Sequence, residues 1–165
     1  MRTKDLFKSS KISWRDSDID AWFDDEQEAT EGERFVTIMP RAMTFKEIWG
    51  DSSPAFSLAD VDSIIESNDP RLSRGTCNLF LVQGAGVLRT VRVYWHGDGW
   101  GVLAGSVGDP NRGGVGDQVF SRDSLPFAKS EPFVPQASLG HSVTLSLDDA
   151  IRICKENGLT VTKTY

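Results

Sequence analysis

Histidine and cysteine are scarce in this chain, and no long hydrophobic run occurs. Its 165 residues include two histidines and two cysteines, too few for a disulfide framework or a Cys/His zinc cluster. Cys77 and Cys154 lie among apolar neighbours, which favours two buried, reduced thiols over a bridge. No apolar stretch approaches the roughly 18 residues that span a bilayer, and none follows the basic first residues as in a secretory signal. We therefore expect a cytoplasmic protein without a membrane partner, and no motif predicts a cofactor or a metal.

The negative charge of the chain is concentrated in one segment. The formal net charge is −6, yet residues 16–33 alone hold nine acidic residues and no lysine or arginine. The remainder carries 18 basic and 15 acidic residues, a net charge of +3. Such asymmetry is typical of a solvated tail or of a surface for a basic partner. Since phosphate contacts need a dense Lys/Arg face, the composition makes nucleic acid an improbable general partner.

This acidic stretch predicts the main contact with a partner. We expect residues 1–33 to form an acidic arm that is disordered or only loosely docked on the rest of the protein. Within it, Trp22 and Phe23 are the expected aromatic anchors, and Asp24 and Asp25 lie beside them. Acidity would steer a basic protein surface towards the arm, and the aromatic rings would supply desolvated contact area. The sequence thus favours a non-enzymatic module that binds another macromolecule.

The core is predicted from residues 76–106. An apolar run from Cys77 to Val82, an alternating segment from Val87 to Trp95 and a third segment from Trp100 to Ala104 are separated by glycine turns. Period-two alternation between such turns is typical of an antiparallel meander. We expect residues 34–165 to form a single α+β domain, an antiparallel meander of about four to six strands with two helices packed on one face.

Helix capping signals predict where those two helices begin. Ser57 and Asp60 form a capping box for a helix over 57–67, and Thr44 with Glu47 forms another for a shorter helix. The second main helix is expected at 147–157, within a C-terminal helix–strand unit over 146–164. A short strand is expected at 35–39 and another within 117–121. A glycine-rich loop (107–116) and a proline-containing linker (125–141) connect these parts.

The middle of the chain also resembles a known group of proteins. The resemblance rests on the run from Met43 to Ile48, on the helix around Val61–Ile65, and on Arg71–Thr76 leading into Leu79–Leu81. Over roughly residues 43–106 the chain is similar to small uncharacterised bacterial proteins from the reduced genomes of candidate phyla. The resemblance implies a bacterial cytosolic origin and assigns no site residue, because the group has no established function.

Two alternatives to the acidic arm remain open. His96 and Asp98 share a tight turn and, with Arg112 from the glycine-rich loop, could form the site of a small enzyme. Arg89 and Arg92 interleave with aromatic residues, as on platforms that bind single-stranded nucleic acid, so a weak nucleic-acid binder is the third hypothesis. Trp95 and Trp100 flank the same turn and are more simply a cross-strand pair covering the core.

Overall fold

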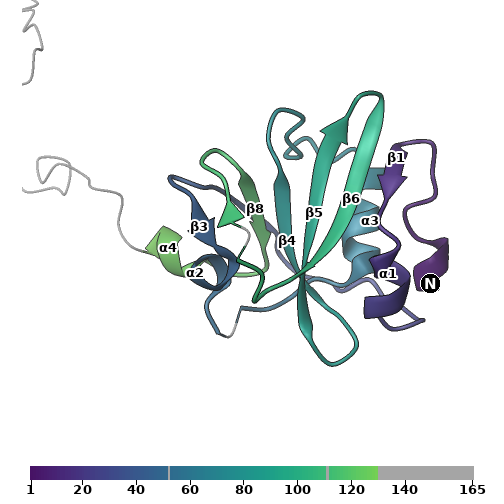
Figure 1. The fold of residues 1–165 in the computed structure, drawn as a ribbon, viewed down its shortest axis with the longest axis horizontal. Coiled ribbons are helices and arrows are strands. Elements are labelled where there is room, and N and C mark those ends of the chain that lie inside the picture. The colour runs from purple at the N-terminus through teal and green to yellow at the C-terminus, as the bar shows by residue number, and fades with distance from the viewer. Residues whose placement is uncertain (52, 111, 130–165) are drawn as a thin grey trace, which may run out of the picture. The chain divides into compact units, whose positions relative to one another are not determined.

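A mixed six-stranded sheet forms the centre of the fold (Figure 1). The computed structural model describes residues 1–51, 53–110 and 112–129. In chain order its elements are η1 (Thr3–Asp5), β1 (Ile12–Arg15), α1 (Asp18–Trp22), β2 (Phe35–Ile38), β3 (Met43–Thr44), α2 (Phe45–Trp49), α3 (Leu58–Glu66), β4 (Asn78–Gln83), β5 (Leu88–His96), β6 (Gly99–Ser106), β7 (Arg112–Gly113), β8 (Gln118–Ser121) and α4 (Pro126–Lys129). The strand order of the main sheet is β1-β6-β5-β4-β8-β2, and β3 pairs with β7 in a separate two-stranded sheet.

The predicted meander is confirmed as β4-β5-β6. β5 pairs antiparallel with β4 on one side and with β6 on the other. Trp95 lies directly opposite Trp100, and their rings meet edge to face with centroids 5.1 Å apart. The two tryptophans are therefore the cross-strand pair that their positions around the turn predicted, and both belong to or pack against a buried core.

The expectation of a purely antiparallel sheet is wrong, because two of its five strand pairs are parallel. β1 runs parallel to β6, and β8 runs parallel to β4. Alternation of apolar and polar residues reports which face a side chain occupies and carries no information on the direction of the neighbouring strand. Parallel neighbours also need a crossover connection rather than a hairpin, so these two pairs join segments that are distant in sequence.

The glycine-rich loop supplies one of those crossovers. Residues 107–116 carry the chain from β6 to β8 and contain β7, which pairs with β3. A Cβ on Gly113 would lie 2.6 Å from Met39 Sδ and 2.8 Å from Leu79 Cδ1. Glycine at this position therefore lets the crossover approach the sheet closely, which is a packing role that the sequence pattern did not reveal.

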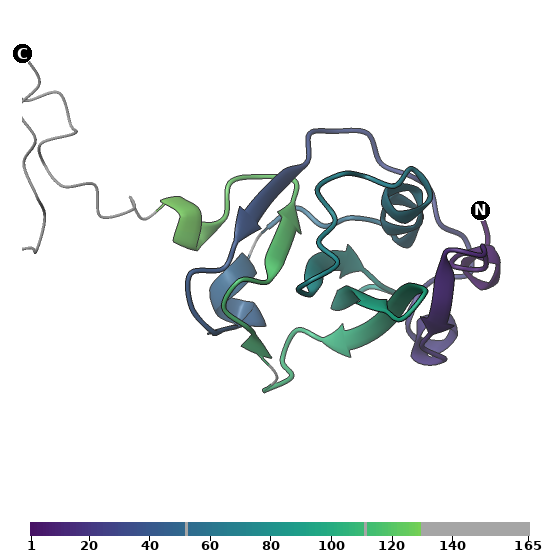
Figure 2. The same ribbon diagram turned by 90° about the horizontal axis from the view of Figure 1, so that it is seen from above.

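Two hydrophobic cores lie on the two faces of the sheet. The first joins Val91 and Val93 of β5 to the buried residues of α3, with Phe80 stacked on Phe120 at 4.6 Å between ring centroids. The second joins Leu79 and other β4 and β8 residues to the segment containing β3, α2 and Leu125. Viewed from above, the N-terminus and α2 lie towards opposite ends of the part of the chain that the structure describes (Figure 2).

Both capping boxes predicted for the described helices are present. Ser57 and Asp60 close the N-terminus of α3, and Thr44 and Glu47 close that of α2, which ends at Gly50 with φ 67°. The helix expected at 147–157, its closing strand and most of the 125–141 linker lie outside the described residues. The packing of two helices on one face of the sheet therefore stays a prediction.

The N-terminal residues differ from the expected loose arm. Residues 1–33 belong to the same compact unit as the sheet and contribute β1 as an edge strand. Leu6, Phe7, Ile19 and Phe23 are 0–4% exposed and form part of the first core. These apolar residues are sparse among many charges, so average composition hides them, yet each one buries a large side chain against the sheet or α3.

Candidate functional site

The acidic segment, residues 16–33, is held in place by hydrogen bonds from its main chain. The amide of Thr3 donates to Asp25 O at 2.8 Å, and the amide of Gln27 donates to Met1 O at 2.7 Å. The buried side chain of Gln27 accepts a hydrogen bond from the amide of Leu58 at the start of α3. The segment therefore follows a fixed path along η1 and the N-terminal end of α3 (Figure 1).

Asp60 is the buried node that ties this segment to the body. Its side chain is fully buried and forms an ion pair with Arg122 at 2.9 Å. The carboxylate also accepts hydrogen bonds from the amide and hydroxyl of Thr30 and from the amide and hydroxyl of Ser57. Burial by itself raises the pKa of Asp60, but these hydrogen bonds outweigh it and hold the pKa below its ordinary value. Asp60 therefore stays ionised and joins three segments that are far apart in sequence.

While the main chain is fixed, most carboxylates of the acidic segment are unpaired among the described residues. Six of its carboxylates are exposed and have no hydrogen-bond or ion-pair partner among the residues that the structure describes: Asp24, Asp25, Glu26, Glu28, Glu31 and Glu33. By contrast, Asp20 pairs with Arg15 at 2.7 Å, and this pairing lowers the pKa of Asp20. A row of fixed, uncompensated carboxylates creates a local negative potential.

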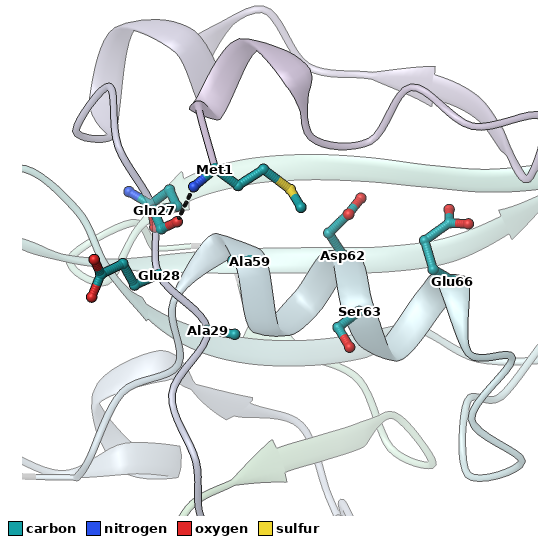
Figure 3. Close-up of a pocket in the computed structure, with 8 residues that line it drawn as sticks. All are labelled: Met1, Gln27, Glu28, Ala29, Ala59, Asp62, Ser63 and Glu66. Carbon is teal, nitrogen blue, oxygen red and sulfur yellow. Dashed lines mark hydrogen bonds between the residues drawn. The ribbon is translucent and has the colours of Figure 1, made fainter.

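A groove lies between this segment and α3 (Figure 3). It has a volume of about 640 Å³ and is lined by Met1, Gln27, Glu28, Ala29, Ala59, Asp62, Ser63 and Glu66. Asp62 and Glu66 are one helical turn apart, so both project from the same side of α3. Burial raises the pKa of Asp62, the hydrogen bond from the Phe7 amide opposes this, and the charge of Glu66 adds to the increase.

The two expected aromatic anchors do not line this groove. Phe23 is 4% exposed and belongs to the first core. Trp22 is half-buried, and the guanidinium of Arg89 lies 4.6 Å from its ring centroid. Asp24 and Asp25 are exposed as the prediction requires, although their carbonyls are bonded to Thr3. The aromatic residues thus fix the segment to the body, and the acidic residues face solvent.

The three residues of the alternative enzyme site come from two places in the fold. His96 ends β5 and Asp98 lies in the following turn, and both are exposed. The backbone of Arg112 lies in β7, opposite Thr44 of β3. The His96 turn lies beside β1, since Ser13 donates to His96 O, and β1 and β3 stand on opposite sides of the molecule in Figure 1. The enzyme hypothesis stays a prediction.

Arg89 and Arg92, the candidate nucleic-acid residues, project from opposite faces of the sheet. They are three positions apart on β5, and successive strand residues alternate between faces. Arg89 covers Trp22 on the side of the first core, whereas Arg92 lies on the same side as the second core, with its guanidinium 6.0 Å from the Phe45 ring centroid. The two arginines therefore cannot act as one basic patch.

Cys77 is unbridged among the described residues, as predicted, but it is half-buried rather than fully buried. It is a free thiol of intermediate exposure. Burial, helped by the nearby charge of Asp117, raises the pKa of Cys77 to about 12, so the thiol is protonated and a poor nucleophile at neutral pH. Cys154 lies outside the described residues.

Sequence reasoning missed the groove, although one signal for it was present. The sequence predicted the start of α3 from its capping box, but the acidic residues farther along the same helix were given no role. The i,i+4 spacing of Asp62 and Glu66 places both carboxylates on one side of the helix. The approach of Glu28 to that side depends on a tertiary contact 34 residues or more away in the chain and has no local signal.

Comparison with known protein families, with curated proteins and with solved structures finds no match to this chain. Across the described ranges, no three His, Cys, Asp or Glu side chains are grouped so as to hold a metal ion. None of the helices in the part of the chain that the structure describes combines the length and apolar character of a membrane span.

Proposed function

We propose that this protein binds a lysine- or arginine-rich segment of another protein in the groove between the acidic segment and α3. The observation that carries the proposal is the row of exposed, unpaired carboxylates beside a groove that is itself lined by Glu28, Asp62 and Glu66. Complementary charge of this kind steers a basic partner and sets its orientation. In this proposal the anchors of the acidic contact surface are carboxylates of α3 rather than Trp22 and Phe23, and a basic partner would compete with Lys11, which lies 3.8 Å from Glu66.

Apolar side chains in the groove suit a polypeptide rather than a free cation. Met1 is 70% exposed, its side chain extends over α3, and Ala29 and Ala59 add further apolar surface to the lining (Figure 3). Lysine and arginine pack their aliphatic stems on such surfaces and extend their charged ends to carboxylates. An extended basic segment can therefore use both the apolar and the acidic parts of the groove.

The fixed path of the acidic segment supports binding at measurable affinity. Because Thr30 and Gln27 already hold the main chain against α3, the carboxylates need little ordering when a partner arrives. Preorganisation of this kind lowers the entropic cost of association. A disordered acidic arm would have to be ordered at the moment of binding.

A charge-neutralisation experiment tests the proposal. The probe is a fluorescein-labelled ten-residue peptide of alternating Lys and Ala, and binding is followed by fluorescence anisotropy at 50 and 150 mM NaCl. The double variant Glu28→Gln/Glu66→Gln keeps the size of both side chains, removes their charge and also removes the ion pair between Glu66 and Lys11. We expect it to bind the peptide at least fivefold more weakly at 150 mM NaCl, with a shallower salt dependence.

A matched control separates the groove from the overall charge of the protein. Asp51→Asn/Asp123→Asn removes two exposed carboxylates that do not line the groove. Equal weakening in both double variants would show only a general attraction between an acidic protein and a cation. That result, or failure of the wild type to bind the peptide at 50 mM NaCl, would overturn the proposal.

A further inference from the structure

An aromatic surface lies on the face of the sheet opposite α3. Tyr94 and His96 of β5 project from this face, since they alternate with Val91, Val93 and Trp95 of the first core. Trp14 of β1 pairs in register with Gly101, which in turn lies opposite Tyr94. Directly paired residues share a face of the sheet. Trp14, Tyr94 and His96, with Arg92, are called the aromatic face below.

The rings of this surface are held apart, with space between them. Trp14 is 44% exposed, and within the described residues it makes no ring contact. Tyr94 occupies the space above Gly101, where a Cβ would lie 2.6 Å from its ring, and it meets the His96 ring edge-on at 6.4 Å between centroids. A cavity of about 280 Å³ is lined by Ser13, Trp14, Tyr94 and His96.

Arg92 adds an uncompensated positive charge to the same surface. It lies two residues before Tyr94 and therefore on the same face of β5, while its guanidinium extends towards Gly105 and Phe45 and lies outside the cavity lining. Arg15, Arg71 and Arg122 each pair with a carboxylate. Arg92 has no hydrogen bond or ion pair with any described residue, and its Nε is buried without an acceptor. A half-buried guanidinium in this state is complementary to an anion that offers two acceptor oxygens, such as a phosphate.

We propose that the aromatic face binds an unpaired stretch of single-stranded nucleic acid. One base enters the cavity and stacks on Trp14 or Tyr94, and a backbone phosphate contacts Arg92. Every base has a π-face, so stacking tolerates any sequence, and glycine at position 101 leaves the ring of Tyr94 in place above the sheet. The acidic segment packs with α3 on the other side of the sheet, so its charge does not line this cavity.

A proline-rich peptide is the other ligand that docks between separated aromatic rings. Arg92 argues against it, because a polyproline segment offers no anion for an unpaired guanidinium. The nucleic-acid hypothesis uses both the rings and the charge, and it is independent of the groove beside α3.

The test uses the full chain and a fluorescein-labelled ten-nucleotide oligothymidylate, with anisotropy measured at 50 mM NaCl. Trp14→Leu and Tyr94→Leu should each weaken binding about tenfold or more. Phe35→Leu is the matched control, because Phe35 is 41% exposed on the opposite edge strand β2, and it should leave binding unchanged. Arg92→Gln should weaken binding and reduce the salt dependence by about one phosphate contact.

Gly101→Ala gives a second variant that removes no ring and no charge. Its Cβ would displace the Tyr94 ring, so we expect weaker binding with an unchanged far-ultraviolet circular dichroism spectrum. Glu28→Gln/Glu66→Gln should not weaken oligonucleotide binding, which keeps this test separate from that of the peptide groove.

Four outcomes would overturn the inference. The first is that the oligonucleotide does not bind at 50 mM NaCl. The second is that Trp14→Leu and Phe35→Leu change the oligonucleotide affinity equally, and the third is that thymidine monophosphate binds as tightly as the ten-nucleotide strand. The fourth is a proline-rich decapeptide that binds with the same sensitivity to Trp14→Leu while the oligonucleotide does not, which would assign the face to a peptide.

Discussion

The acidic segment and the aromatic face both present unpaired side chains on a fixed main chain, but they are fixed in different ways. The aromatic face belongs to β5 and β6, which are joined by a continuous register from Arg89–Ser106 to His96–Gly99. Two of the hydrogen bonds that hold the acidic segment, from the amide and the hydroxyl of Thr30, converge on the single buried carboxylate of Asp60. One substitution can therefore loosen the segment around Thr30, while the bonds of Thr3 and Gln27 remain. No single side chain holds the aromatic face.

The largest effect is expected from Asp60→Ala. The change leaves Arg122 buried without its partner and removes the acceptor for Thr30 and Ser57. Breaking a buried ion pair by removing one member destabilises a protein by about 3–5 kcal/mol. The measurement is the free energy of unfolding from urea titration, followed by circular dichroism. Peptide binding in the groove should weaken in the same variant, and the aromatic face should still bind its ligand.

Asp5→Ala is the control for that experiment. Asp5 pairs with Arg2 at 2.9 Å, but both side chains are largely exposed, and such pairs contribute about 0–1 kcal/mol. If Asp60→Ala were no more destabilising than Asp5→Ala, the buried node would not hold the acidic segment, and the contrast with the aromatic face would disappear.

The ionisation of Asp60 should also be visible in the pH dependence of stability. Since the pKa of Asp60 is lowered in the folded protein, its contribution is fully present above the ordinary carboxyl value of 3.8 and is lost as the pH falls through the folded pKa. Asn resembles the protonated acid, so the gap in unfolding free energy between wild type and Asp60→Asn should be constant from pH 5 to 8. It should narrow below about pH 4. A gap that stays constant down to pH 2 would contradict this assignment.

Substitutions at two glycines test how tightly the two parts of one sheet face are packed. Gly113 lies where the second core covers this face, and Gly101 lies in the open aromatic face. A Cβ on Gly113 meets Met39 and Leu79 in the second core, so Gly113→Ala should destabilise by about 1–3 kcal/mol through overpacking. The three atoms nearest to a Cβ on Gly101 belong to the outer end of the Tyr94 side chain, which also lines the adjoining cavity and can move into it. We expect Gly101→Ala to change the unfolding free energy by less than about 1 kcal/mol. Equal losses in both variants would mean that the aromatic face is as tightly packed as the core.

Local signals in the sequence were sufficient for the meander, the strands β2 and β8 and the capping boxes of α2 and α3. Each of these depends on residues a few positions apart, such as Ser57 and Asp60. The parallel pairs β1–β6 and β8–β4 join segments that are distant in sequence. The alternation of apolar and polar residues along a strand does not indicate which strand lies beside it or in which direction that strand runs. For the same reason the second function of Asp60, as the partner of Arg122 and Thr30, was not predicted.

The sequence predicted which charged residues are exposed on the candidate surfaces, but not which aromatic residues are buried. Asp24 and Asp25 are exposed because charged side chains are expensive to bury without partners. Phe23 was misjudged because its charged neighbours in sequence are not its neighbours in space. Arg92 was identified among aromatic residues in the sequence, but the approach of Trp14 to Tyr94 requires the parallel pairing of β1 with β6.

The smallest effect, and the only stabilising one, is expected from Asp62→Asn. Burial raises the pKa of Asp62 in the folded protein, so its ionisation opposes folding. This penalty is absent below the ordinary carboxyl value of 3.8 and complete above the raised folded pKa. Asn keeps the acceptor for the Phe7 amide. Urea titration should therefore show a higher free energy of unfolding at pH 7 and no difference at pH 3.

Asp25→Asn is the comparison for Asp62→Asn, because Asp25 is exposed and lies outside the groove lining, and it should change stability little at either pH. A loss of stability in Asp62→Asn at pH 7 would contradict the argument from burial. The same variant should bind the Lys-Ala peptide more weakly, since it removes a groove carboxylate. Higher stability together with weaker peptide binding in Asp62→Asn would mean that the negative charge of Asp62 strengthens binding at the cost of folding stability. The negative charge of Asp60, on the same helix, stabilises the fold.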